Sequence, residues 1–403
     1  MDLVIAGTLS LLVIAILVAI AARRLSLPYT VGLVISGIVL ALAHVHTGIR
    51  LTHDIIFEVI LPPLLFEAAI NIHWHELRRD MLPVLVLSIF GVVISAAIVC
   101  TGMVWLLAWP ISSALVFGVL IAATDPVAVI AMFKDIGLTG RLGLLVESES
   151  LFNDGVAAVL FGLALSWTQG NAGGAVSAGW ALVGTSGGGM LAGLTAGAAG
   201  LVIAGRTADH FVETAVTVAV AYGAFLGAEY IHVSGVLATV SAGLLMGSVG
   251  LRGDQPQFGL SGQGRSFAVE FWEFLAFIAN SFVFLLIGMT AARIPFAELG
   301  YGALAIAILL VLFGRAMTVY PICLAFRWSS SAISRPEQHV LWWGGLRGAL
   351  ALALVLSLPA SLPLHDAIII ATFAVVAFSV LVQGLTMSPL LRALKLLPPS
   401  DSN

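Results

Sequence analysis

The sequence is poor in charge and in cysteine. Only 9% of its 403 residues are Asp, Glu, Lys or Arg, whereas 60% are hydrophobic and the mean hydropathy is +1.10. Soluble domains carry about 25% charged residues, so this composition excludes a soluble globular chain and indicates a membrane protein. Cys100 and Cys323 lie in separate apolar runs, and no disulfide framework is indicated. The small net charge of −4 gives no reason to expect a nucleic-acid partner.

Signatures of pumps and membrane enzymes are missing as well. No Gly-x-x-x-x-Gly-Lys-Ser/Thr motif occurs, which excludes an ATP-driven pump made of this chain alone. The run His73-Trp74-His75-Glu76 does not match His-Glu-x-x-His and lies near a predicted loop, so we interpret it as interfacial. We therefore expect neither an enzyme nor a cofactor.

The sequence does contain a series of long apolar runs. A helix of about 20 residues crosses a hydrocarbon core of about 30 Å. Lipid offers no partners to backbone amides, and the alternating pattern of a barrel is absent, so each run predicts a helix. The result is an all-α polytopic membrane protein with 13 transmembrane helices, at residues 3–22, 28–45, 54–71, 82–107, 112–133, 142–166, 177–204, 211–229, 233–250, 270–292, 297–326, 338–358 and 366–391. Residues 397–403 form a short cytoplasmic tail, and we expect no regulatory domain.

The distribution of basic residues orients these spans. Of the 17 Lys and Arg residues, only Arg50 and Arg293 follow even-numbered spans, and only Arg315 and Arg347 lie inside spans. All the others follow odd-numbered spans. Because positive charge favours the cytoplasmic side, the N-terminus is predicted outside and the C-terminus inside.

An ionisable side chain at membrane depth is costly and needs a partner, a water-filled cavity or a function. Span 5 contains Thr124-Asp125-Pro126. Proline lacks an amide donor and biases the preceding residue away from helical geometry, so this run predicts an interrupted helix. Freed carbonyls, the Thr124 hydroxyl and the Asp125 carboxylate are hard oxygen ligands that suit a small cation. A simple proline kink, with Asp125 capping the second half-helix, is the alternative and is compatible with that role.

Span 6 carries three carboxylates, Glu147, Glu149 and Asp154, together with Ser150 and Asn153. On a helix Ser150 and Asp154 share one face, while Glu149 and Asn153 share the neighbouring face. We therefore expect Asp154 and Ser150 to face a cavity and Glu149 to turn toward another helix. At least one carboxylate should be paired and at least one solvated.

Span 12 places Arg347 among Gly344, Gly345 and Gly348, which predicts a second broken or closely packed helix. Spans 5 and 12 occupy corresponding positions if spans 1–6 and 8–13 form two halves. Breaks at matching places in two halves indicate the midplane binding site of a transporter.

Span 7 carries Gly189, Gly193 and Gly197 at a spacing of four residues, which favours close helix approach. The contact could lie within one subunit or between two, and we expect a subunit interface.

Six stretches together resemble the NhaP/NHE-type monovalent cation/proton antiporter family, the sodium/hydrogen exchangers. They occur in the family's order along nearly the whole chain, and the Glu…Asn-Asp-Gly run of span 6 is the most specific. The stretches are Leu61-Pro-Pro-Leu-Leu-Phe-Glu67-Ala, Ala123-Thr124-Asp125-Pro126-Val-Ala-Val, Glu149-Ser150-Leu-Phe-Asn153-Asp154-Gly155, Phe271-Trp-Glu273-Phe-Leu-Ala-Phe-Ile-Ala-Asn280-Ser, Gly314-Arg315-Ala-Met-Thr-Val-Tyr320-Pro and Gly345-Leu-Arg347-Gly348.

The resemblance implies a homodimer in a prokaryotic plasma membrane, serving pH homeostasis. Each subunit, residues 1–396, would combine a dimerisation domain (3–71 and 177–292) with an ion-transport core (82–166 and 297–391), in which spans 5 and 12 are unwound, cross and belong to two inverted repeats. It also implies roles for individual residues. Asp154 would hold the cation or the proton, Ser150, Thr124 and Asp125 would add oxygens, Glu67 would approach from span 3, Asn153 would orient the site, Glu149 would pair with Arg347, and Arg315 would offset the negative ends of the broken helices.

The predicted mechanism is competition for one carboxylate. A partly desolvated Asp154 would take up either H⁺ or Na⁺, because low dielectric disfavours the bare charge. Asn153-Asp154 resembles the electroneutral members, and the only lysines, Lys134 and Lys395, lie outside the predicted spans, so one-for-one exchange is expected. Lithium is a further candidate ion. K⁺/H⁺ exchange is the alternative within the same fold, and a cation channel is a remote one.

Overall fold

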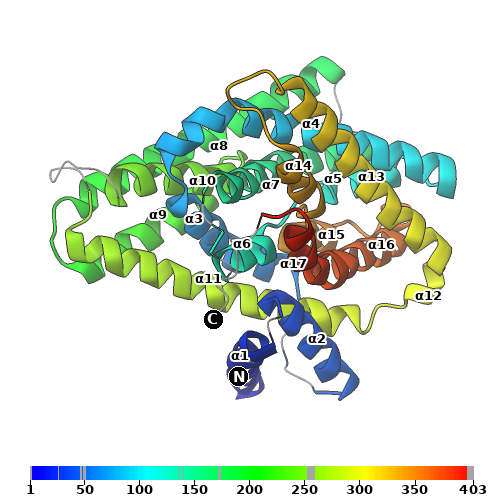
Figure 1. Ribbon diagram of the computed structural model, residues 1–403, viewed down its shortest axis with the longest axis horizontal. Helices are drawn as coiled ribbons and strands as arrows, with labels where there is room; N and C mark the ends of the chain where they lie inside the picture. Colours follow the sequence, from blue (N-terminus) through cyan, green and yellow to red (C-terminus); the bar gives the residue numbers. More distant parts are fainter. Residues whose placement is uncertain are drawn as a thin grey trace. The chain divides into compact units, whose positions relative to one another are not determined.

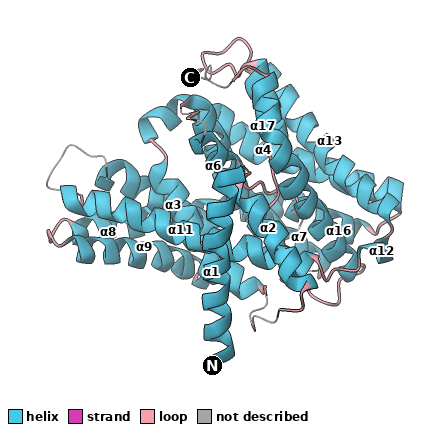
Figure 2. Cartoon of the chain, turned by 60° about the horizontal axis from the view of Figure 1, so that its bottom comes forward, coloured by secondary structure: helices cyan, strands magenta, loops and turns pink. Residues whose placement is uncertain are grey.

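A computed structural model of the chain describes residues 2–25, 27–45, 48, 51–135, 137–138, 140–170, 174–251 and 259–396. Arg50, Arg252 and the predicted tail 397–403 lie outside the described residues. Within the described ranges every regular element is a helix (Figure 2).

The helices follow one another along the chain as labelled in Figure 1. They are α1 (Asp2–Leu25), α2 (Tyr29–Leu42), the π-helix η1 (Ile55–Ile60), α3 (Leu61–Asn71), α4 (Trp74–Leu107), α5 (Ile111–Leu120), α6 (Val127–Asp135), α7 (Arg141–Thr168), α8 (Ala175–Ala204), α9 (His210–Tyr230), α10 (Gly235–Leu245), η2 (Met246–Leu251), α11 (Gly262–Ala291), α12 (Phe296–Leu299), α13 (Tyr301–Ala325), α14 (Arg335–Trp343), α15 (Ala349–Leu356), α16 (His365–Phe378), η3 (Ser379–Gln383) and α17 (Gly384–Ala393).

Every predicted span coincides with helical residues. Among the described residues, seven helices are long and apolar enough to cross a membrane, and four shorter apolar helices accompany them. The prediction of an all-helical membrane protein is therefore confirmed for this part of the chain. The count of thirteen spans stays a prediction.

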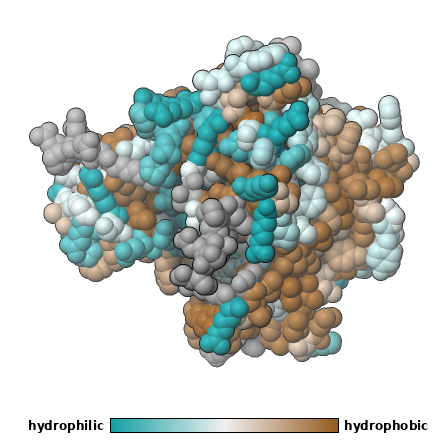
Figure 3. Space-filling view, viewed as in Figure 1, coloured by the Kyte–Doolittle hydropathy of each residue, from teal (hydrophilic) through white to brown (hydrophobic). Residues whose placement is uncertain are grey.

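Helix α13 has one exposed apolar side and one buried side. Leu309, Phe313 and Leu324 are 63%, 53% and 57% exposed, and they recur at helical spacing on one side. Arg315 and Thr318 lie on the buried side of the same helix. Figure 3 shows hydrophobic residues covering most of the visible surface over α2, α13 and α16. Such an apolar face suits the hydrocarbon of a bilayer, because apolar side chains need no hydrogen bonds from water.

The chain divides into two compact units. The first contains Met1–Ile56, Leu82–Asn153 and Ser281–Asn403, and the second contains Phe57–Met81 and Asp154–Asn280. The four boundaries fall inside η1, α4, α7 and α11. The first 56 residues thus group with the helices predicted to form the transport core, although the sequence placed residues 3–71 in a dimerisation domain. The functional division into those two domains stays a proposal.

Two helices are interrupted in mid-span. α5 ends at Leu120 and α6 begins at Val127, so the predicted break at Thr124-Asp125-Pro126 is confirmed. α14 ends at Trp343 and α15 begins at Ala349, which confirms the second predicted break. Pro126 explains the first break, because it cannot donate an amide hydrogen bond to the preceding turn.

The glycines of α8 pack against α10 of the same chain. A Cβ at Gly189 would lie 2.5 Å from the Ser234 carbonyl oxygen, and one at Gly193 would overlap the Ala238 carbonyl. The expectation that these glycines form a subunit interface is therefore wrong. Small residues permit close approach to any neighbouring helix, and the spacing in the sequence does not identify that neighbour.

We expect Gly193→Ala to destabilise the protein by about 1–3 kcal/mol, because the added methyl group forces two backbones apart. Gly184→Ala, on the same helix, is the matched control, since a Cβ there meets nothing within 4 Å. That control should be neutral or slightly stabilising, as alanine is the better helix former. Thermal unfolding of both variants in detergent measures the difference, and equal melting temperatures would contradict the α8–α10 contact.

Candidate functional site

The two helix breaks are joined through Asp125. Its amide donates to the Leu346 carbonyl oxygen at 2.8 Å. Its carboxylate accepts hydrogen bonds from the Val127 amide at 3.0 Å and from the Ala349 amide. Val127 and Ala349 begin α6 and α15, so one negative group lies at the amino ends of two half-helices, where the helix dipole favours it. Asp125 thus caps the second half-helix of span 5, as the alternative interpretation held, and also caps α15.

Gly348 leaves the space that the Asp125 carboxylate occupies. A Cβ at position 348 would overlap Asp125 Oδ2. Any larger residue would displace the Asp125 carboxylate from the amino end of α6 or of α15. The glycine that suggested a broken helix is therefore also needed for the contact between the two breaks.

Arg347 lies at the carboxyl end of α5. Its Nη1 donates to the carbonyl oxygens of Ala122 and Ala123 at 2.6 and 2.8 Å. These carbonyls follow the end of α5, where the helix dipole is negative and a cation is favourable. Arg347 is only 1% exposed. Arg347 thus lies where a cation offsets the negative end of α5, a position that the resemblance did not assign to it.

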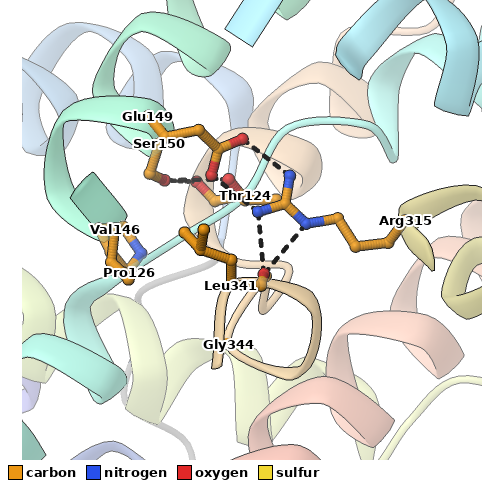
Figure 4. A pocket seen from close by; sticks show the side chains of 9 residues that line it. Thr124, Pro126, Val146, Glu149, Ser150, Arg315, Leu341 and Gly344 are labelled. Carbon is orange, nitrogen blue, oxygen red and sulfur yellow. Dashed lines mark hydrogen bonds and ion pairs between the residues drawn. The ribbon is translucent and has the colours of Figure 1, made fainter. Parts of the chain in front are cut away.

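Arg315 is the ion partner of Glu149. Its Nη1 and Nη2 each lie 2.7 Å from one carboxylate oxygen of Glu149, in a bidentate pair (Figure 4). Nη2 also donates to the Leu341 carbonyl oxygen at 3.0 Å, in the last turn of α14. Arg315 and Glu149 are 5% and 2% exposed. The predicted pair of Glu149 with Arg347 is wrong. The role of Arg315 in offsetting a broken helix stays a prediction, and its hydrogen bond to Leu341 is consistent with it.

The physical reason for this correction lies in where the two arginines originate. Arg315 is on the continuous helix α13, and its long side chain reaches across to α7, where the guanidinium fork meets the Glu149 carboxylate. Arg347 is within the unwound segment itself, so backbone carbonyls are its first neighbours. Sequence motifs supply both arginines and the carboxylate, but they do not supply the distances among the three segments that carry them.

Three uncharged side chains gather beside the first break. The Ser150 hydroxyl donates to the Thr124 carbonyl, and the Thr124 hydroxyl donates to Ser150 Oγ at 3.1 Å. Asn153 Nδ2 donates to Thr124 Oγ1 at 3.2 Å and to Glu149 Oε1 at 3.4 Å. These bonds orient the Asn153 amide, and its Oδ1 has no hydrogen-bond partner among the described residues although the side chain is 2% exposed. A buried carbonyl oxygen in that state suits a cation or a donor.

A small cavity adjoins this group in the first unit. It is lined by Thr124, Pro126, Val146, Glu149, Ser150, Arg315, Leu341, Gly344 and Gly345 (Figure 4). The cavity volume is about 10 Å³, which is near the lower limit for one water molecule. The cavity therefore reaches both the ion pair and the Thr124–Ser150 oxygens.

Asp154 and Glu67 belong to the second unit. Asp154 follows Asn153 on α7, one helical turn after Ser150, and is half-buried. Glu67 is half-buried on α3, where Asn71 Nδ2 donates to its Oε1 at 2.8 Å. The roles of both carboxylates as cation ligands stay predictions.

Two supporting residues, Ser88 and Asn71, were not predicted from the sequence. The Ser88 hydroxyl on α4 donates to the Glu149 carbonyl oxygen at 2.9 Å, although serine is common in membrane helices and carries no signal of its own. Asn71 lies four residues after Glu67, which places it on the same helix face. That spacing could have identified Asn71 from the sequence.

The family described as "Sodium/hydrogen exchanger, transmembrane" matches residues 10–393. The chain belongs to the sodium/hydrogen exchanger family. It is therefore a multi-pass integral membrane transporter and not an enzyme.

Individual members of the exchanger family support this assignment. The chain is 40% identical over 378 residues to the Na⁺/H⁺ antiporter ApNhaP of Aphanothece halophytica, covering 92% of this chain and 70% of that protein. It is 34% identical to the Na⁺/H⁺ antiporter NhaH of Halobacillus dabanensis, covering 96% of each. The solved sodium proton antiporter MjNhaP1 from Methanocaldococcus jannaschii superposes with a TM-score of 0.77 at 22% identity, over 98% of both chains. This last likeness supports the fold.

Proposed function

We propose that this chain is a secondary antiporter that exchanges Na⁺ for H⁺, with Asp154 taking up either ion in turn. The names of its relatives support the substrates. The observation that carries the site is the buried Asn153 amide. Its Nδ2 donates to Thr124 Oγ1, which in turn bonds Ser150, and its Oδ1 has no hydrogen-bond partner among the described residues. Neutral oxygens of this kind bind small cations without adding charge to a membrane protein's interior.

The proposed mechanism is competition followed by reorientation. A bare carboxylate is costly at low dielectric, so Asp154 is neutralised by a proton or by Na⁺, and never by both together. The carrier reorients in either neutral state and not in the charged one. A gradient of one ion then drives the other uphill.

We propose one-for-one, electroneutral exchange. In the Asn153-Asp154 pair only Asp154 carries a carboxylate that can titrate. The two lysines of the chain lie outside the apolar spans. Arg315 is held by Glu149 and Leu341, and Arg347 by two carbonyls, and arginine keeps its proton in proteins. No second group in this set therefore exchanges a proton in each cycle.

The proposed architecture follows the exchanger family. It has 13 spans, an outside N-terminus and an inside C-terminus, and two inverted repeats whose broken helices cross at the site. We further propose a homodimer in a plasma membrane, with a dimerisation domain and a moving transport core. The two breaks and their charge compensation by Asp125 and Arg347 support the crossing.

K⁺/H⁺ exchange is the second candidate, because the same oxygens bind either cation and the size of the site decides between them. The experiment places purified protein in liposomes with an acidic interior and adds Na⁺ or K⁺, with and without a voltage clamp. We expect Na⁺ to dissipate the pH gradient at a rate that the clamp does not change.

Each of the other possible results would contradict a different part of the proposal. Dissipation by K⁺ alone would keep the mechanism and change the substrate. Acceleration by the clamp would refute one-for-one exchange and point to a second titrating carboxylate, Asp125 first. Ion flux without proton coupling would indicate the channel alternative.

A further inference from the structure

Helix α3, which carries Glu67, is fixed at its beginning by a tyrosine. Pro62 and Pro63 occupy the first turn, and neither has an amide to donate to the preceding π-helix η1. The Tyr222 hydroxyl on α9 donates to the Val59 carbonyl oxygen at 3.0 Å. This bond replaces the donor that Pro63 lacks and ties the start of α3 to its neighbour.

One face of α3 is packed too closely to move. A Cβ at Gly243 of α10 would lie 2.6 Å from Ala69 Cβ, and one at Gly247 would lie 2.5 Å from the Ile70 carbonyl oxygen. The Phe66 ring lies 4.6 Å from that of Trp272, measured between centroids. The backbone beneath Glu67 is thus held by close packing, and the position of the carboxylate depends on the conformation of the Glu67 side chain.

Asn71 contacts the Glu67 side chain directly. Its Nδ2 donates to Glu67 Oε1 at 2.8 Å and to the Glu67 carbonyl oxygen at 3.1 Å. Two bonds to one residue fix the amide plane, and the amide in turn fixes the carboxylate. Asn71 is the last residue of α3, and the chain turns to an extended conformation at Ile72. A hydrogen bond from an amide to a charged acceptor is stronger than one between two neutral groups.

We propose that Asn71 is a positioning residue for cation binding. It holds Glu67 in one rotamer, with Oε1 engaged by the amide, so that the carboxylate is ordered before the cation arrives. This inference rests on the proposed function together with the predicted role of Glu67 as a cation ligand. Ordering a flexible acidic side chain in advance raises affinity, because binding then costs less side-chain entropy.

The test is the dependence of exchange on Na⁺ concentration in liposomes. We expect Asn71→Ala to raise the KM for Na⁺ about tenfold, the loss that one hydrogen bond to a charged group represents, with Vmax little changed. Asn71→Gln keeps an amide and should restore part of the affinity. Gln263→Ala, which removes an amide from the exposed side of α11, is the control and should leave KM unchanged.

A double-substitution cycle assigns the effect to Glu67. In a Glu67→Ala background, Asn71→Ala should cause no further rise in KM. An unchanged KM in Asn71→Ala, or a fall in melting temperature and Vmax at constant KM, would overturn the proposal and indicate a structural role only. Absence of cation exchange by the wild-type protein would instead refute the proposed function, so the two failures are distinguishable.

Discussion

Asp154→Asn should reduce exchange to the level of protein-free liposomes while leaving the fold intact. The substitution keeps the shape of the side chain and removes the only group that is proposed to hold a proton and a cation alternately. Its position one turn after Ser150 on α7 is retained. The measurement is the decay of a pH gradient on addition of Na⁺, together with thermal unfolding of the same preparation.

Glu298→Gln is the matched control for this experiment. It makes the same change of charge on the exposed short helix α12 and should exchange like the wild type. Saturable Na⁺-dependent proton flux through the Asp154→Asn variant would remove Asp154 from the mechanism. Loss of activity together with loss of folding would be followed by Asp154→Glu, which should retain binding at reduced rate.

Breaking the ion pair of Arg315 with Glu149 should have the largest effect on stability. Glu149→Gln or Arg315→Met alone leaves one buried charge without its counter-charge, which costs about 3–5 kcal/mol. Removing both charges together should cost less than the sum of the two, because no uncompensated charge remains. The bidentate geometry and the burial of both groups are what make the pair strongly coupled.

The same cycle distinguishes the two arginines. Glu149→Gln combined with Arg347→Met should be close to additive, whereas its combination with Arg315→Met should not. Melting temperatures in detergent provide the comparison. A stronger coupling of Glu149 to Arg347 than to Arg315 would support the pairing inferred from the motifs and contradict the one seen here.

Charge compensation at the breaks explains why these residues occur together. Asp125 lies at the amino ends of α6 and α15, Arg347 at the carboxyl end of α5, and Arg315 reaches the last turn of α14. Interrupting two helices at membrane depth exposes four sets of backbone groups, and each set is met by a charge or a hydrogen bond. In the proposed site, the oxygens of Thr124 and Ser150 are then available to a cation without further cost to the backbone.

Much of this protein follows from the sequence alone. The scarcity of charge determined the membrane environment, and Pro126 and the glycines around Arg347 determined the two breaks, because these are local properties of the chain. The run from Glu149 to Asp154 likewise defined the candidate site through helical spacing. Such features can be predicted without knowing which helices pack against each segment.

Tertiary structure alone decided which groups meet. It paired Glu149 with Arg315, assigned Arg347 to the carbonyls of α5, and turned the glycines of α8 toward α10. Each of these contacts joins residues far apart in the sequence, and a side chain's face on its own helix does not reveal the helix that it touches. The physical reason is that long arginine side chains and small glycine surfaces fit several partners equally well, so packing of the whole fold selects one.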